Sequence, residues 1–313
     1  MYRMSEGQVP DFLDYISRNV ELIIPYRKDG VSYFKKYEPG DKPFLGKGNT
    51  DYSVKPFFFP YKDAMFKYTK DGDIQHKPEA KERVIFGVRP CDLHGISVTD
   101  MFFSNDIKDP HYMELREKTI LIALDCTIPG KNCFCDSLGK RNPIGHDVVL
   151  FHVGKHYYAR SETDRGRDLI EGSGVFKESE DIEQPKRSPC KKSAAPVENS
   201  KIKWEKWGKQ CFGCSACTAV CPTCVCFDVE DEVQLDGNVE RNRLWASCFT
   251  KDFTTVAGNH CFRLSHTEML KQFVNHKFSY FEDEFGVTMC VGCGRCIGAC
   301  TAKIDISKII SGK

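Results

Sequence analysis

The feature that most constrains this chain is a run of four cysteines that occurs twice, with identical spacing, in its C-terminal third. The first copy is Cys211-x2-Cys214-x2-Cys217-x3-Cys221, followed by Pro222, and the second is Cys290-x2-Cys293-x2-Cys296-x3-Cys300. In this ferredoxin pattern three thiolates wrap one cubane cluster and the fourth binds the partner cluster. The spacing therefore predicts two [4Fe–4S] clusters.

The expected ligands form two crossed sets. The first quartet is Cys211, Cys214, Cys217 and Cys300, and the second quartet is Cys290, Cys293, Cys296 and Cys221. Glycines between ligands, such as Gly213 and Gly292, allow the backbone to approach sulfide closely. Thr301 stands where proline usually follows the fourth cysteine, which changes the turn but removes no ligand. Zinc is the alternative, but two complete quartets at identical spacing do not fit the paired cysteines of zinc ribbons.

Composition agrees with metal-bound thiols rather than with disulfides. The 313-residue chain has 17 cysteines, an odd number, and its first residues lack the apolar core of a secretory signal. Disulfide frameworks belong to small secreted chains, so clustered thiols in a reducing cytosol are better explained as metal ligands. The longest apolar runs have the length of strands, and we expect a cytoplasmic protein without a membrane span.

Charge and missing motifs argue against other function classes. The 45 basic residues nearly balance 44 acidic ones, for a net charge of +1, so we expect no nucleic-acid partner. No G-x-G-x-x-G follows a predicted strand, and no G-x-x-x-x-G-K-[ST] occurs. We therefore expect no flavin or nucleotide in this chain.

Hydrophobic patterns predict an α+β chain. Residues 1–175 are expected to form a mixed α/β domain, with buried strands at Val84–Val88 and Thr119–Leu124. Residues 176–203, rich in charge, Pro and Ser, are predicted to be an exposed linker. Residues 204–313 are expected to form the ferredoxin-like domain, with a long insertion at 222–289 between the two cysteine motifs. Further expected elements are helices at 5–18, 93–103 and 267–273 and hairpins at 20–37 and 148–159.

A second group of cysteines lies in the N-terminal domain. The N-terminal quartet is Cys91, Cys126, Cys133 and Cys135. Cys91 and Cys126 each follow a predicted buried strand, and parallel strands would bring both thiols to one sheet edge. We expect a third [4Fe–4S] cluster here, with zinc or unliganded thiols as alternatives. Cys190, in the predicted linker, is expected to take no part.

The insertion holds four more cysteines whose spacing is less informative. Cys224, Cys226 and Cys248 are candidates for a further metal site, whereas Cys261 lacks ligand-like spacing. The alternative is that all four are small buried apolar side chains. Spacing favours that alternative. For five cationic or imidazole residues nearby, a solvated face is expected for most, with a partner-docking or cluster-tuning surface as the alternative: Arg241, Arg243, Arg263, His260 and His276.

Several of these motifs together resemble one family. They are Arg89-Pro90-Cys91-Asp92-Leu93, Cys133-Phe134-Cys135, the run Cys221 to Asp228, Trp245-Ala246-Ser247-Cys248 and the run Cys290 to Cys296. This set resembles the iron–sulfur β subunit of cytoplasmic NAD(P)-linked [NiFe]-hydrogenases (sulfhydrogenases) and the A subunit of anaerobic sulfite reductase. Related subunits occur in flavin oxidoreductases coupled to heterodisulfide reductase. The resemblance covers most of the chain from Val84 onward.

The resemblance implies an electron-transfer subunit of an anaerobic oxidoreductase complex. A flavin subunit would exchange hydride with NAD(P)H, and this chain would pass single electrons to a hydrogenase, sulfite reductase or heterodisulfide reductase subunit. The resemblance also raises the expectation that Cys224, Cys226 and the N-terminal quartet have functional roles. Two alternatives stay open: a redox enzyme that binds flavin or substrate in its own α/β domain, and a zinc-bound structural module.

Overall fold

The computed structural model describes residues 1–76, 80–194 and 197–312. Its largest element is an eight-stranded sheet in the order β10-β1-β9-β8-β7-β6-β2-β3. The bounds are β1 Tyr2–Ser5, β2 Glu21–Lys28, β3 Val31–Lys36, β6 Arg83–Val88, β7 Thr119–Leu124, β8 Val148–Val153, β9 His156–Ser161 and β10 Lys177–Glu178. Strands β2, β6, β7 and β8 pair in parallel, and the outer strands are antiparallel. The predicted parallel neighbours at 84–88 and 119–124 are therefore confirmed.

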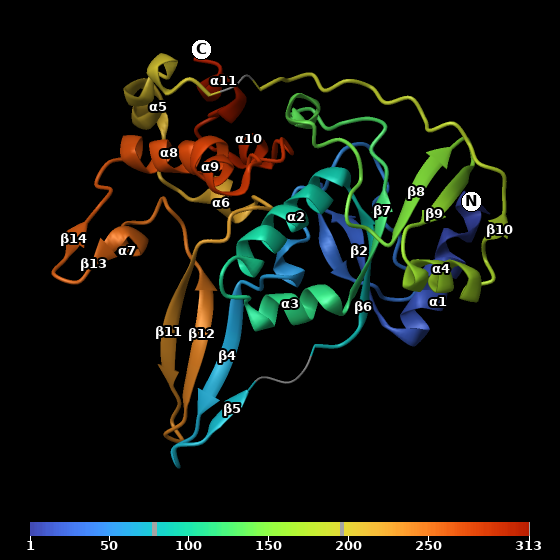
Figure 1. Ribbon diagram of the computed structural model, residues 1–313, viewed down its shortest axis with the longest axis horizontal. Helices are drawn as coiled ribbons and strands as arrows, with labels where there is room; N and C mark the ends of the chain where they lie inside the picture. Colours follow the sequence, from blue (N-terminus) through green and yellow to red (C-terminus); the bar gives the residue numbers. More distant parts are fainter. Residues whose placement is uncertain (77–79, 195–196, 313) are drawn as a thin grey trace.

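Helices cover both faces of this sheet (Figure 1). The bounds are α1 Val9–Asn19, α2 Pro90–Ser104, α3 Pro110–Glu117 and α4 Asp164–Gly172. Alternate strand residues point to opposite faces, so Ile85 and Leu121 share a core with α2 and α3. Val84 and Ile122 pack with α1 and α4 on the other face. Helix α2 begins three residues earlier than the pattern predicts, and Cys91 lies in its first turn.

A second sheet joins segments that are far apart in the sequence. It has the order β11-β12-β4-β5, with bounds β4 Lys62–Tyr68, β5 Ile74–His76, β11 Phe227–Val233 and β12 Val239–Trp245. It forms an arm that projects away from the large sheet (Figure 1). The N-terminal part of the chain and the 222–289 insertion thus share one sheet, a contact that the sequence analysis does not predict.

The C-terminal part is mostly short helices. They are α5 Trp204–Gln210, α6 Ala216–Ala219, α7 Lys251–Thr254, α8 His266–Asn275, a π-helical turn at His276–Tyr280, α9 Phe281–Phe285, α10 Arg295–Ala299 and α11 Ile306–Ile310. A small hairpin is formed by β13 Thr255–Val256 and β14 His260–Cys261. Helices α6 and α10 follow the two cysteine loops and lie against each other. The mixed α+β fold class predicted from the sequence is confirmed.

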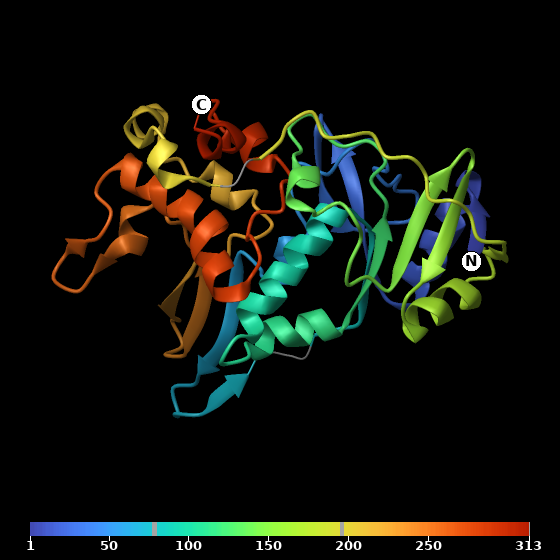
Figure 2. The same cartoon turned by 45° about the horizontal axis from the view of Figure 1, so that its top comes forward.

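The segment expected to be a linker is held at several points; its residues 195–196 lie outside the described part of the chain. It crosses the top of the molecule from β10 to α5 (Figure 2). Arg187 forms an ion pair with buried Asp125 at 2.6 Å, and the amide of Ser188 donates to the Thr127 carbonyl. Lys192 pairs with Asp305 of the C-terminal part. These contacts fix the segment along the loop that follows β7.

Among the described helices, none has both the length and the apolar character needed to cross a bilayer.

Candidate metal centres

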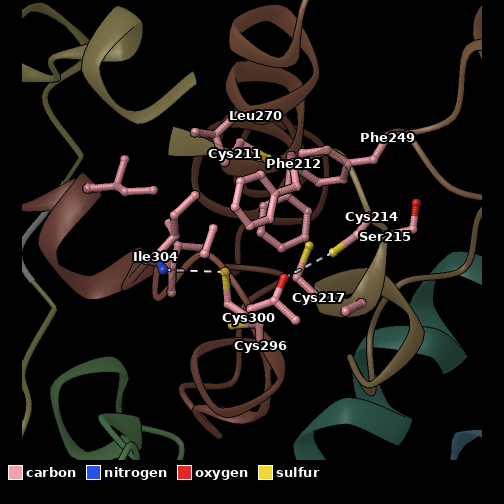
Figure 3. Close-up of a pocket in the computed structure, with 16 residues that line it drawn as sticks. Cys211, Phe212, Cys214, Ser215, Cys217, Phe249, Leu270, Cys296, Cys300 and Ile304 are labelled. Carbon is pink, nitrogen blue, oxygen red and sulfur yellow. Dashed lines mark hydrogen bonds between the residues drawn. The ribbon is translucent and has the colours of Figure 1, made fainter. Parts of the chain in front are cut away.

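The first quartet lines one pocket in the C-terminal part of the fold (Figure 3). The loop before α6 supplies Cys211 and Cys214, helix α6 supplies Cys217, and Cys300 follows directly after α10. The remaining wall is largely apolar and includes Phe249, Leu270 and Ile304. Cys214 is solvent-exposed, and Phe212 beside it is 67% exposed. The crossed arrangement of thiols is therefore present, at a pocket that reaches the surface.

The second quartet lies deeper in the fold. Cys221 and Cys293 are buried, and Cys290 and Cys296 are partly buried. Burial raises the pKa of the Cys290 thiol to about 12, and the thiols of Cys293 and Cys221 near it add to this shift. The Cys296 pKa is raised by burial and by the same neighbouring thiols. The structure thus also brings the four thiols of this set together.

A buried lysine contacts the second quartet. Lys277, in the π-helical turn, donates from Nζ to Cys221 Sγ at 3.3 Å and to Thr223 Oγ1 at 3.1 Å. Burial would lower its pKa, but the thiols of Cys221, Cys224 and Cys290 outweigh this and raise it. The pKa of Cys221 is lowered, chiefly by a hydrogen bond from the Cys224 thiol. Lys277 also lowers it. A lysine side chain and a cysteine side chain are therefore hydrogen-bonded to each other inside the fold.

The N-terminal quartet gathers where β6 and β7 end. Burial raises the pKa of Cys91, and the carboxylate of Asp92 is the next cause. The nearby thiols of Cys293 and Cys133 add to the shift. The pKa of Cys133 rises to about 12 through burial and the neighbouring thiols of Cys293 and Cys126. The Cys133 thiol donates to the Cys293 carbonyl at 3.5 Å. The predicted group is thus present, and it lies against the second quartet.

Two glycines allow this close approach. The amide of Phe134 donates to the carbonyl of Gly292 at 2.8 Å. A Cβ on Gly292 would lie 2.6 Å from the backbone of Cys135, and one on Gly294 would lie 2.2 Å from the Asn132 carbonyl oxygen. Both glycines also have positive φ, which other residues adopt only with strain. The loop of the N-terminal quartet therefore packs directly onto the second cysteine loop.

Cys190 is not the isolated thiol that the sequence analysis expects. Its Sγ lies 3.7 Å from Cys135 Sγ, and its amide donates to Asp136 at 2.6 Å. Among the described residues, only Cys135, Asp136 and Cys190 bring three candidate ligand atoms within 4.8 Å of one another. No sequence signal identifies this residue, because only the fold of the segment beside the 127–135 loop places it there.

The cysteines of the insertion border the two ferredoxin quartets. The Cys224 thiol hydrogen-bonds to Cys221, and Cys248 lies near both Cys217 and Cys226. Burial raises the Cys248 pKa to about 12, with Cys226 as the next cause. Cys261 lies apart, on β14, and its thiol donates to the Arg263 carbonyl at 3.3 Å. The thiols of Cys224, Cys226 and Cys248 are therefore neighbours of proposed ligands and are not arranged around a single ion.

The donor sets fit iron–sulfur clusters. Cys211, Cys290 and Cys300 accept amide N–H hydrogen bonds from Gly213, Gly292 and Ile304 at 3.3 to 3.5 Å, as sulfurs around clusters commonly do. Among the described residues, neither ferredoxin quartet has three sulfur atoms within 4.8 Å of one another, a distance that suits the ligands of a single ion. Sets of four thiols that accept such amide hydrogen bonds suit a cubane cluster. Buried thiols with raised pKa values also need a bound cation in order to become thiolates.

Comparison with known proteins decides the family. Residues 210–304 match the family model described as a 4Fe–4S dicluster domain. The chain is also 30% identical over 323 aligned positions to the sulfhydrogenase 2 subunit beta of Pyrococcus furiosus, covering 96% of this chain and 94% of that protein. The chain belongs to the sulfhydrogenase β subunit family. No solved structure matches it.

Membership of this family confirms the resemblance inferred from the cysteine motifs. The chain carries an iron–sulfur dicluster domain and is a relative of a hydrogenase subunit, which supports a role in electron transfer. The matched dicluster region contains both ferredoxin quartets and the insertion, but it excludes the N-terminal quartet.

Proposed function

We propose that this chain relays single electrons through [4Fe–4S] clusters between a flavin subunit that reacts with NAD(P)H and a hydrogenase module. A sulfite reductase or heterodisulfide reductase module could take the place of the hydrogenase. The observation that carries the proposal is that each of the three cysteine quartets lies close to the next. Cys217 of the first quartet lies near Cys221 of the second, and Cys293 of the second contacts Cys133 of the N-terminal quartet.

The polypeptide supplies position and environment. Bound clusters would supply one-electron redox chemistry, and closely spaced clusters allow an electron to pass from one to the next. The buried ion pair between Arg295 and Asp92, at 2.7 and 2.8 Å, ties the second cysteine loop to the start of α2. Arg295 also donates to the Thr50 carbonyl at 2.8 Å. These contacts would hold the N-terminal and second quartets at a constant separation.

Guanidinium groups surround the N-terminal quartet. Buried Arg89 donates to the Asp125 carbonyl at 2.8 Å and lies near the thiols of Cys126 and Cys91. Arg141 donates to the Cys126 carbonyl at 2.9 Å. Asp136 pairs with Arg141, so Arg89 is the cation that would stabilise an anionic cluster with four thiolates, which supports a third [4Fe–4S] cluster in the proposal.

The test is the content of iron, acid-labile sulfide, zinc and flavin in anaerobically purified protein. With three clusters we expect about twelve iron and twelve sulfide per chain, and no flavin. About eight of each would remove the third cluster from the proposal. Zinc without sulfide would overturn the relay, and stoichiometric flavin would favour an enzyme with its own active site.

Two cysteine variants test the ligands of the third site. We expect Cys91→Ala to lose about one to four iron per chain, because one cubane iron loses its thiolate. Cys190→Ala is the matched control and should retain the full iron content. The reverse result would exchange the two residues in the ligand set. Zinc that is lost in Cys190→Ala would instead assign a single-ion site to Cys135 and Cys190.

A further inference from the structure

The two ferredoxin quartets differ in the charge that the fold places beside them. Lys277 is 3% exposed and hydrogen-bonds to the sulfur of Cys221. Its carbonyl also accepts amide hydrogen bonds from Met289 at 2.9 Å and Cys290 at 3.4 Å. One residue therefore touches both chain segments that supply the second quartet. It sits in a π-helical turn, a feature that is often found at functional sites.

No carboxylate cancels this charge. In the described part of the chain, the recorded ion pairs do not include Lys277. Two further cations lie near the thiols of this quartet: Lys55, whose Nζ donates to the Cys224 carbonyl at 2.9 Å, near Cys221, and Lys140 near Cys290. By contrast, Asp92 neutralises Arg295 through two hydrogen bonds. The net charge beside the second quartet is therefore positive.

The first quartet has no such neighbour among the residues that line its pocket. These lining residues are cysteines, small residues and apolar side chains, with no lysine or arginine. The hydrogen bonds to its sulfurs come from neutral groups, such as the amides of Gly213 and Ile304. Ligand types and spacing are the same in both quartets, so the difference lies in exposure and in the surrounding charge, and Lys277 supplies the charge beside the second quartet.

We infer that Lys277 raises the reduction potential of the cluster held by the second quartet. The inference rests on the proposed function, because it requires a cluster at this quartet. One added electron makes a cluster more negative by one charge, and a buried ammonium in contact with a ligand sulfur stabilises that charge strongly at low dielectric. The second quartet lies between the first quartet and the N-terminal quartet, so Lys277 acts on the middle site of the relay.

The test compares three variants of the full chain, purified anaerobically, by redox titration followed by electron paramagnetic resonance. Lys277→Gln keeps a hydrogen-bond donor but removes the charge. We expect at least a tenfold shift of one reduction equilibrium towards the oxidised state, which is about 59 mV for one electron. Lys277→Arg keeps the charge and should restore most of the potential. Lys206→Gln changes an exposed lysine of the same domain and should leave both potentials unchanged.

The outcomes are separable. Equal potentials in Lys277→Gln and the parent chain, at equal iron content, would overturn the inference while leaving the relay intact. A loss of potential in Lys277→Arg as large as in Lys277→Gln would show that packing, not charge, is responsible, and would also overturn it. If Lys277→Gln loses iron, Lys277→Met, which also lacks the charge, takes its place in the comparison with Lys277→Arg and the parent. A parent chain without iron and sulfide would instead overturn the proposed function.

Discussion

The two cysteine loops of the dicluster domain have the same ligand spacing and different surroundings. The pocket of the first quartet reaches the surface at Cys214 and has apolar walls. The second quartet is enclosed by the N-terminal domain and contacts a buried lysine. The comparison shows that a local motif specifies which ligands gather, whereas the rest of the chain decides exposure and charge. Each prediction below tests one part of this difference.

The largest expected effect is on the crossed ligands. Cys300→Ala should alter the first site, with a loss of about one to four iron per chain, because its cubane keeps only three thiolates. Cys221→Ala should do the same at the second site. Iron content and the two paramagnetic signals measure the effect, and each variant should change a different signal. Cys261→Ala is the control and should keep all the iron. A change of the same signal in both variants would contradict the crossed assignment.

The next effect concerns the enclosure of the second quartet. Arg295→Met leaves Asp92 as an unpaired buried carboxylate, and removing one partner of such a pair costs about 3–5 kcal/mol of folding free energy. Anaerobic urea unfolding, followed by the loss of cluster absorbance, measures this change. Asp92→Leu combined with Arg295→Met should recover part of the loss. If the single variant unfolds at the same urea concentration as the parent, the pair does not stabilise the contact between the two regions.

The smallest effect is kinetic and needs no variant. In air-saturated buffer we expect the first site to lose its signal several-fold faster than the second. The reason is exposure: Cys214 is open to solvent, whereas Cys221 and Cys293 are buried. Signals recorded over time after air exposure provide the measurement. Loss at equal rates would show that enclosure by the N-terminal domain does not protect the second site.

Much of the fold follows from local pattern. The strands at 84–88 and 119–124 are continuous apolar runs that suit a parallel sheet covered on both faces, and the structure pairs them in parallel. The helix predicted at 5–18 from its 3.6-residue apolar period is present but begins at Val9, because strand β1 (Tyr2–Ser5) and a 3-10 turn (Glu6–Gln8) precede it. These elements were predictable because burial on a sheet or helix face imposes a repeating pattern on neighbouring residues.

Long-range contacts were not predictable in the same way. Arg243 was expected on a solvated face, but it is 1% exposed and forms an ion pair with Asp63 at 2.8 Å. Asp63 comes from β4, which pairs with β12 across more than half of the chain. A single charged residue carries no period, so sequence alone cannot show that another segment supplies its partner.

The same division applies to the metal centres. The sequence by itself determined the two ferredoxin quartets, because a cluster needs thiolates at fixed short spacing and such spacing is written in the chain. It also indicated the N-terminal quartet, through cysteines at strand ends. Only the tertiary structure decided that Cys190 approaches Cys135, that the N-terminal quartet lies on the second, and that Lys277 contacts Cys221. These are contacts between distant segments, and their geometry depends on how the whole chain packs.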